Sequence, residues 1–328
     1  IGVRLVGSEM CIRDRYTCIR IISKQYRNCL LHMVYIWGIT EVIISILQKA
    51  NYIESNHHDF GITGTFGNPG PLGGLLAVCW IVSIFFIYEN IQNKHRILTL
   101  PFCMIACFIL YGLLLSGSRA GWTAALVGSM IFLWQWLKRK HTIKVKPTLL
   151  KSGFLLIITI FIISIYFIRR DSADGRLLIW YNTITMIKDY PLFGIGVGGW
   201  QANYMLYQAE YFLQSPNSPY ILLADNIFYT YNEFLHITAE QGIVGLVVVT
   251  WLFYALFSYK EKNNTDHCLK SALITFLVFS FFSYPSEVFP LEILFISIIG
   301  MMKSKTIKTF TISISTKYII RSITFIFI

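Results

Sequence analysis

Two arginines stand out because each lies among small or polar residues beside a long apolar stretch. Arg119 lies in the segment SGSRAGW, and Arg176 begins the segment RLLIWYNTITMIKDYPLFGIGVGGW. An arginine at a membrane boundary is costly unless it reaches the lipid head groups or meets an anion. Guanidinium groups hold phosphate oxygens through paired, charge-assisted hydrogen bonds. Both residues are therefore candidates for anion binding, although a side chain that reaches toward the head groups beside Trp122 explains Arg119 equally well.

Four more ionisable residues lie in or just before the segment YNEFLHITAEQGIVGL, which begins another apolar stretch. Glu233, His236 and Glu240 recur at intervals that place them on one face of a helix, and Asp225 precedes them. Ionisable groups at the mouth of a membrane helix are functional candidates, and carboxylates and imidazoles are the usual proton-transfer groups. A solvated helix entrance would give a similar pattern.

Two other patterns are interpreted as structural. His57, His58 and Asp59 resemble metal ligands, but adjacent residues rarely bind one ion well, and no further cluster supports them. The glycine-rich run at 194–199, GIGVGG, lacks the GxGxxG spacing and the strand–helix context of a dinucleotide site. We therefore expect neither a metal site nor a cofactor.

The elements that would position these residues are membrane helices. Of the 328 residues, 55% are hydrophobic and 14% are charged, and the mean hydropathy is +0.57, which is too apolar for an ordinary soluble domain. A spanning helix needs about 20 mostly apolar residues. We expect an all-α membrane protein with about eight transmembrane helices, at 29–48, 71–88, 97–115, 120–137, 149–168, 234–257, 270–284 and 288–302.

The basic residues predict which ends of these helices face outward. A net charge of +11 would suggest nucleic acid in a soluble protein, but here the lysines and arginines fall in short segments between apolar stretches, which is the positive-inside signature of a membrane protein. Nucleic acid is therefore not an expected partner. The inner segments contain Arg20, Lys24, Arg27, Lys94, Arg96, Lys138, Arg139, Lys140, Lys144, Lys146, Lys260, Lys262, Lys270, Lys303, Lys305 and Lys308. With strict alternation, the outward segments are 49–70, 116–119, 169–233 and 285–287.

The expected organisation has a long outward loop at 169–233 between two groups of helices, 16–168 and 234–302. In this loop the apolar residues from Arg176 to Lys188 suit a helix along the membrane surface, with Arg176 at its N-terminus, where the helix dipole favours an anion. Residues 1–15, IGVRLVGSEMCIRDR, resemble translated adaptor sequence and are expected to be non-native, on an N-terminally truncated fragment. The basic tail 303–328 is left unassigned.

The segments SGSRAGW, GRLLIWYNTITMIKDYPLFGIGVGGW and YNEFLHITAEQGIVGL together resemble the O-antigen ligase and polymerase family of bacterial glycosyltransferases. The turn GTFGNPG fits as well, and the similarity runs from about residue 38 to residue 300. The resemblance implies a multi-pass protein of the inner membrane with its active loop in the periplasm. It also implies transfer of a saccharide from an undecaprenyl diphosphate carrier to lipid A core or another glycan, among membrane lipids and without a metal ion or a nucleotide sugar.

By match to the family motifs, Arg119 and Arg176 would stabilise the diphosphate leaving group. Family ligases usually place a histidine just before the asparagine that is Asn232 here, and this chain has Tyr231 instead. An unperturbed tyrosine is a poor base near pH 7. The candidate bases are Glu233, which is preferred, and Asp225 and His236, and a displacement that needs little help from a base is also open. The expected substrate-binding residues are Arg169, Arg170, Trp180, Asp225 and Asn232.

Three alternatives remain at this point. The acceptor could be lipid A core, another carrier-linked chain as in a polymerase, or a protein hydroxyl. A different class would be a transporter or lipid-binding protein for an anionic substrate, but no internal repeat of the kind common in transporters is found. The third is an inactive fragment.

Overall fold

A computed structural model describes residues 2–94, 96–140, 147–168, 170–258, 261 and 263–302. Within these residues every regular element is a helix, so the expected all-α fold is confirmed. The elements are α1 (Gly2–Lys49), α2 (Pro69–Gln92), α3 (Arg96–Leu115), α4 (Arg119–Lys140), α5 (Pro147–Ile168), α6 (Arg170–Asp189), α7 (Gly199–Gln214), the 3-10 turn η1 (Ile221–Leu223), α8 (Glu233–Phe257), α9 (Asn264–Ser280), the 3-10 turn η2 (Pro285–Glu287) and α10 (Phe289–Met301).

Each of the eight stretches predicted to span the membrane overlaps a helix of this structure, but the stretch 270–284 runs past the end of α9 at Ser280. Five helical segments in the described part of the chain are long and apolar enough to cross a bilayer: Tyr26–Lys49, Pro69–Gln92, Ile97–Leu115, Arg119–Lys138 and Glu233–Phe257. Two shorter apolar segments, Ser152–Ser164 and Phe289–Met301, lie in α5 and α10. The chain is therefore an all-α membrane protein.

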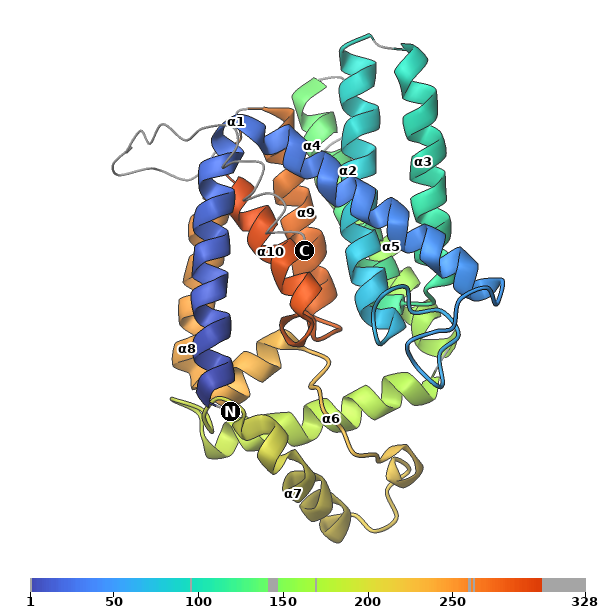
Figure 1. Cartoon of the computed structure of the whole chain (residues 1–328). Helices are drawn as coiled ribbons and strands as arrows, with labels where there is room; N and C mark the ends of the chain where they lie inside the picture. Colours follow the sequence, from blue (N-terminus) through green and yellow to red (C-terminus); the bar gives the residue numbers. More distant parts are fainter. Residues whose placement is uncertain are drawn as a thin grey trace.

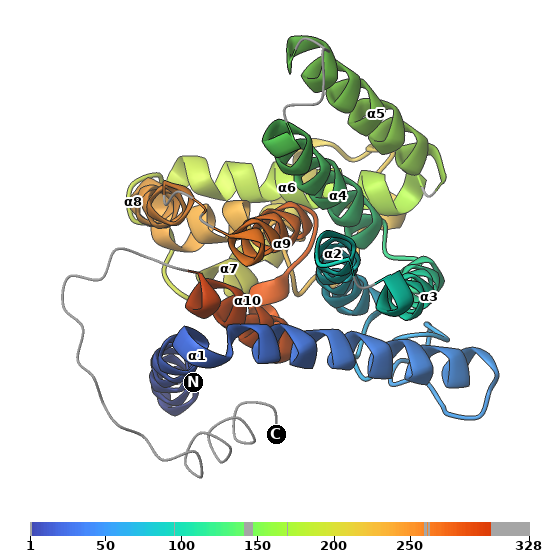
Figure 2. The same ribbon diagram turned by 90° about the horizontal axis from the view of Figure 1, so that it is seen from above.

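The bundle is built around α2, which packs against α1, α3, α4 and α9. Its buried residues include Leu72, Leu75, Leu76 and Phe85, so this helix is apolar on nearly every side, as a helix at the centre of a bundle must be. Seen from above, α5 lies at the periphery beyond α4, and α1 runs along the opposite edge (Figure 2). The α1–α2 connection lies at the end of the bundle where α6 crosses (Figure 1).

The first helix is longer than the predicted span. Residues 2–49 form one helix with a kink at Tyr26, and the part that follows the kink is the spanning segment. The part before it contains the residues set aside as non-native, and its side chains are described at 14–21. Ile19 in this part packs into the main core, and Gly300 of α10 lies against it.

The long outward loop forms a layer of helices across one end of the bundle (Figure 1). Helix α6 runs across the end of the bundle, which is the lower end in Figure 1, and α7 packs against it. A small second core holds this layer together, formed by Ile179 and Met186 of α6, Trp200 and Tyr204 of α7, and Ala239 of α8. We call this layer the roof (residues 170–232). It is fixed to α8 by apolar packing as well as by the covalent chain, which continues from the roof into α8.

The predicted start of the surface helix was wrong. Helix α6 begins at Arg170, so Arg176 lies in its second turn instead of at its N-terminus. Asp171 in the first turn suits the positive end of the helix dipole. Gly175 does not interrupt the helix, since a single interior glycine costs only about 1 kcal/mol. The N-terminus of this helix therefore does not lie at Arg176, and its dipole does not favour an anion at that residue.

A buried carboxylate in α1 fixes the turn GTFGNPG. One oxygen of Glu41 accepts a hydrogen bond from the backbone N–H of Thr65 at 2.9 Å, and the other accepts from the Thr65 hydroxyl at 2.6 Å and from Trp37 Nε1 at 3.3 Å. About two turns further along α1, Gln48 binds the backbone of Thr63 and Gly64. These two side chains of α1 therefore hold the turn that leads into α2.

Gly64 is required in this turn for two reasons. Its φ of +61° is a conformation that other residues adopt with strain, and a Cβ there would lie within van der Waals overlap of Glu41 Oε2 and Leu72 Cδ1. We predict that Gly64→Ala lowers the free energy of unfolding by roughly 1–3 kcal/mol. Gly67→Ala in the same turn is the control, because nothing lies within 4 Å of a Cβ at that position. Thermal unfolding in detergent is the measurement, and equal stability of the two variants would contradict the account.

Candidate functional site

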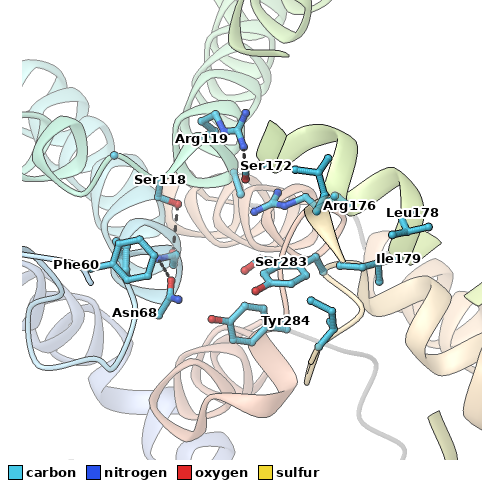
Figure 3. A pocket seen from close by; sticks show the side chains of 18 of the residues that line it. Phe60, Asn68, Ser118, Arg119, Ser172, Arg176, Leu178, Ile179, Ser283 and Tyr284 are labelled. Atoms are coloured by element: carbon cyan, nitrogen blue, oxygen red, sulfur yellow. Dashed lines mark hydrogen bonds between the residues drawn. The ribbon is translucent and has the colours of Figure 1, made fainter. Parts of the chain in front are cut away.

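A polar cavity of about 240 Å³ lies where the roof meets the bundle. Residues from all four segments predicted to face outward, or from their immediate edges, line it (Figure 3). They are Phe60, Asn68, Pro69, Gly70, Gly117, Ser118, Arg119, Ala120, Ser172, Gly175, Arg176, Leu178, Ile179, Tyr204, Gln208, Leu223, Ile227, Tyr231, Ser283 and Tyr284. These segments are far apart in the sequence, and the distribution of basic residues predicted that all of them lie on the same side of the membrane.

Arg119 and Arg176 lie together in this cavity. Arg119 is the first residue of α4, and its Nη2 donates a hydrogen bond to Ser172 Oγ at 2.8 Å (Figure 3). Arg176 donates from Nη1 to the carbonyl oxygen of Phe282 at 2.9 Å. Burial, and secondly the positive charge of Arg119, lower the pKa of Arg176 to about 10, so this guanidinium remains charged at neutral pH. Two neighbouring cations in a partly buried site leave a local excess of positive charge.

The helix ends around the cavity add to this positive potential. The N-termini of α2 and α4 both contribute lining residues, Pro69 and Gly70 from one and Arg119 and Ala120 from the other. Backbone N–H groups at a helix N-terminus favour negative charge. Among the described residues that line the cavity there is no Asp, Glu or His. The site therefore suits an anion.

An apolar groove of about 250 Å³ adjoins the cavity and shares three of its residues, Arg119, Ala120 and Arg176. The other lining residues come from α4, α5, α6 and the α9–α10 connection: Thr123, Ile162, Tyr166, Ala173, Leu177, Trp180 and Phe282. Ile162 and Leu177 are more than one-third exposed, so the groove is open toward the side of the bundle. The two arginines thus lie between a polar space and an apolar one.

The α9–α10 connection is held at both ends by charged side chains. Arg176 binds the carbonyl oxygen of Phe282, and the carboxylate of Glu233 accepts hydrogen bonds from the backbone N–H of Ser286 at 2.9 Å and from its hydroxyl at 2.7 Å. Ser283 and Tyr284, which line the cavity, lie between these two attachments. Glu233 itself does not line the cavity, so it contributes to the site by placing this connection.

Tyr231, at the position of the family histidine, lines the cavity with its ring over the guanidinium of Arg176, whose Cζ is 4.9 Å from the ring centroid. Its φ is +52°, which is uncommon for a residue with a side chain. Burial raises the pKa of Tyr231, and the charge of Arg176 opposes this effect. The hydroxyl is therefore protonated at neutral pH.

Glu233, His236 and Glu240 share one face of α8, as their spacing predicted. His236 Nε2 lies 3.3 Å from Glu240 Oε1, and His236 Nδ1 lies 4.0 Å from Glu233 Oε2 and 3.9 Å from Glu287 Oε1. Glu240 also accepts a hydrogen bond from the backbone N–H of Trp200 at 3.4 Å. These groups mainly join α8 to the roof and to η2, and none of them lines the cavity.

The remaining predicted substrate-binding residues lie in different surroundings. Trp180 lines the apolar groove and donates from Nε1 to the carbonyl oxygen of Thr230 at 3.1 Å. Asp225 is exposed, and Arg170 is exposed and pairs with Asp174 at 3.4 Å. Neither lines the cavity or the groove. Arg169 lies outside the described residues.

The GIGVGG run, at 194–199, contacts α8 through its backbone. Helix α8 is interrupted at Gly242, where φ is +66°, and the groups freed by the break pair with the segment 191–196. The carbonyl oxygens of Ala239 and Glu240 accept from the N–H groups of Ile195 and Gly196, each at 2.9 Å, and Pro191 and Leu192 accept from the N–H groups of Ile243 and Val244. A Cβ at Gly194 would overlap the backbone of Glu240, so this close approach requires glycine.

Several lining residues were not singled out from the sequence. Ser172, Ser283, Tyr284 and Gln208 enter the cavity because of how the roof and the α9–α10 connection fold. Asn68 and Phe60 lie in or before the GTFGNPG turn, where the glycine and proline pattern was noted but no side chain was selected. Small polar residues and tyrosines of this kind are common at membrane boundaries, so their type alone does not reveal a site.

Asn232 is the N-cap of α8. Its side-chain oxygen accepts hydrogen bonds from the backbone N–H groups of Phe234 at 3.0 Å and Leu235 at 3.1 Å, and the residue is buried. We predict that Asn232→Ala lowers the free energy of unfolding by about 1 kcal/mol, whereas Asn232→Ser keeps most of the stability because a serine oxygen can cap the helix. Thermal unfolding in detergent measures this. If Asn232→Ser were as unstable as Asn232→Ala, capping would not be the role of the side chain.

Comparison with known proteins identifies related sequences. Residues 103–250 match the sequence profile of the O-antigen ligase family. A protein of Rickettsia conorii whose name proposes a polysaccharide ligase is 24% identical over 226 residues, which cover 64% of this chain and 51% of the relative. A Rickettsia felis protein of the same proposed activity is 25% identical over 232 residues, covering 65% of this chain and 52% of the relative. The chain spans about half the length of these curated relatives.

The matched range runs from α3 into α8 and contains in full the three sequence segments that carried the resemblance, 116–122, 175–200 and 231–246. It includes Arg119, Arg176 and Tyr231, which meet in the cavity. The resemblance of this chain to the O-antigen ligase family is therefore confirmed, over residues 103–250.

Proposed function

We propose that this protein transfers a saccharide from an undecaprenyl diphosphate carrier to an envelope acceptor, on the periplasmic face of the bacterial inner membrane. The observation that carries the proposal is the position of Arg119 and Arg176 between the polar cavity and the apolar groove. A lipid-linked sugar has the same order of parts, with a diphosphate between an apolar chain and a polar ring. In this arrangement the isoprenoid chain lies in the groove, the diphosphate binds both arginines, and the sugar enters the cavity.

The proposed chemistry depends on charge that develops during the reaction. The bond between the anomeric carbon and the phosphate oxygen breaks, its electron pair stays on the diphosphate, and the acceptor hydroxyl oxygen forms the new bond to carbon. Guanidinium groups already in place at the leaving oxygens stabilise this charge more in the transition state than in the ground state. The arginines and the N-termini of α2 and α4 supply that stabilisation in our proposal, so the reaction needs no metal ion.

The acceptor hydroxyl must also lose a proton. Because no carboxylate or imidazole is found among the described lining residues, we propose that the leaving diphosphate takes this proton. Glu233, preferred as the base on its sequence position, instead binds Ser286 through its carboxylate and has the role of a positioning residue in this proposal. Tyr231 stacks on Arg176 and keeps the guanidinium directed into the cavity.

The identity of the acceptor belongs to the same proposal. We favour a ligase-like transfer to lipid A core, with a second carrier-linked chain, as in a polymerase, as the alternative. Incubation of the protein with undecaprenyl diphosphate-linked saccharide and each acceptor separately, including a hydroxyl-bearing peptide, identifies which one becomes glycosylated. Transport of the donor without transfer to any of them would favour the anion-transporter class.

Arg119→Ala and Arg176→Ala are each expected to lower the rate of saccharide transfer by at least about 100-fold, because each removes one charge-assisted donor at the leaving group. The assay uses proteoliposomes in the presence of EDTA, since side chains and not a metal ion supply the charge in this proposal. Lys188→Ala is the control, because Lys188 is exposed at the end of α6 and lines neither space. Near-normal transfer by both arginine variants, with normal membrane insertion, would refute the proposal.

Glu233→Gln is expected to transfer saccharide at no less than about one-hundredth of the wild-type rate. Loss of a general base would lower the rate by roughly 100-fold or more, but Glu233 is a positioning residue in this proposal, and glutamine still accepts hydrogen bonds from Ser286. Glu233→Ala is expected to lose more activity and to unfold at a lower temperature, because the Ser286 backbone N–H then has no acceptor. Tyr231→Phe, which keeps the ring on Arg176, is the comparison and is expected to lose less than Glu233→Ala. A loss well beyond 100-fold for Glu233→Gln, at unchanged unfolding temperature, would show that the carboxylate of Glu233 is the base and would contradict its positioning role.

A further inference from the structure

One wall of the polar cavity contains buried polar groups that have no hydrogen-bond partner in the described part of the chain. This wall is formed by α7, where Tyr204 and Gln208 are one helical turn apart and therefore on the same face. Both line the cavity, with 0% and 6% of their surface exposed. The Tyr204 hydroxyl and Gln208 Oε1 are unpaired, as is Nδ2 of the neighbouring Asn182 on α6.

The neighbouring groups do not satisfy these atoms. Gln208 donates from Nε2 to the carbonyl oxygen of Asp225 at 3.4 Å, which fixes its amide and leaves Oε1 without a donor. The Asn182 amide is close enough to Tyr204 to oppose the increase in pKa that burial causes, but the two groups form no hydrogen bond of normal geometry. Folded proteins pair nearly all of their buried polar groups. Tyr204 and Gln208 line the cavity, whereas Asn182 does not, so the two unpaired groups of α7 indicate a partner that enters from the cavity.

The types of these groups indicate the chemistry of the partner. Gln208 Oε1 can only accept a hydrogen bond, whereas the Tyr204 hydroxyl can donate or accept one. A phosphate oxygen accepts hydrogen bonds but does not donate them, so it would leave Gln208 Oε1 unpaired. A hydroxyl both donates and accepts. The wall therefore suits a neutral ligand with several hydroxyl groups.

The rest of the cavity agrees with a sugar ring. Tyr231 and Tyr284 line it, with their ring centroids 5.2 Å apart and their planes nearly perpendicular, and aromatic side chains of this kind can pack against the C–H groups of a sugar. Its volume of about 240 Å³ is below the roughly 300–1,000 Å³ of pockets that hold drug-sized molecules, which favours a single head group over a chain of sugars.

We propose that Tyr204 and Gln208 bind the hydroxyl groups of the first sugar of the donor, the one attached to the diphosphate, and so determine which sugar the protein accepts. This inference rests on the proposed function, because it places the diphosphate on Arg119 and Arg176 in the same cavity. The arginines then bind the part that all donors share, and α7 binds the part in which donors differ.

The test separates the two parts of the ligand. The whole chain, purified in nanodiscs, is titrated with undecaprenyl diphosphate and with the same lipid bearing a single glucose, galactose or N-acetylglucosamine, and each Kd is measured by thermophoresis. The wild type is expected to bind at least one sugar-bearing probe more tightly than the sugar-free one. Tyr204→Phe and Gln208→Leu are each expected to reduce this preference by about three- to tenfold and to leave the sugar-free Kd unchanged.

Two controls make the result specific. Tyr207→Phe removes a hydroxyl from the same helix, but this hydroxyl donates to Asp189 at 2.7 Å and lies outside the cavity, so the preference should not change. Tyr204→Phe without ligand should unfold at the wild-type temperature or above it, because the lost hydroxyl had no partner. A clear decrease would show that the hydroxyl is bonded within the protein and would overturn the inference.

The possible outcomes also distinguish this inference from the proposed function. If Arg176→Ala weakens binding of all probes but Tyr204→Phe and Gln208→Leu leave the preference for sugar intact, the sugar site is refuted and the proposed function stands. If the wild type does not prefer any sugar-bearing probe, the sugar site is refuted as well. If the arginine variants bind the sugar-free lipid as the wild type does, the proposed function fails, and the inference fails with it.

Discussion

The arrangement of the site depends on the side chain of Arg176. Its guanidinium donates to the carbonyl oxygen of Phe282, carries the ring of Tyr231 on its face and lies beside Arg119. These contacts join α6, the segment before α8, the α9–α10 connection and α4. The first two stabilise the side chain in a partly buried place, and the third opposes it through like-charge repulsion. The protein therefore keeps two cations together at a cost that an anionic ligand would relieve, which is a common arrangement at functional sites.

Around this side chain the roof is held by two different kinds of interaction. Apolar packing of Ile179, Met186, Trp200, Tyr204 and Ala239 gives the roof its own small core. Hydrogen bonds between backbones then join the segment 191–196 to the interrupted helix α8. Since the groups freed by the break in α8 are paired by this segment, the interruption leaves few buried polar groups unsatisfied. The cavity thus has rigid elements on both sides, as a site that positions charge in advance requires.

Much of this could be predicted from the sequence because the membrane restricts the possible folds. Apolar stretches of the right length located the helices, and the distribution of lysine and arginine placed Arg119, Arg176 and Tyr231 on one side, where the structure brings them into one cavity. The start of α6 was misplaced because the prediction rested on the apolar residues from Arg176 to Lys188, whereas the first turn of the helix is polar and contains Asp171. The contributions of Ser283, Tyr284 and Gln208 could not be predicted, because they depend on how segments far apart in the sequence meet around the cavity, for which local sequence has no signal.

The pairing of 191–196 with α8 has a consequence for how such a protein can change over time. Four hydrogen bonds that attach the roof to α8 join main-chain atoms only. The side chains of Leu192, Phe193 and Val197 in this stretch are more than half exposed. Mutations that replace those side chains leave the attachment in place, as long as the glycines at 194 and 242 remain. A lineage can therefore accumulate many substitutions in this stretch and retain the geometry of the cavity, so divergence here is a poor guide to divergence in activity.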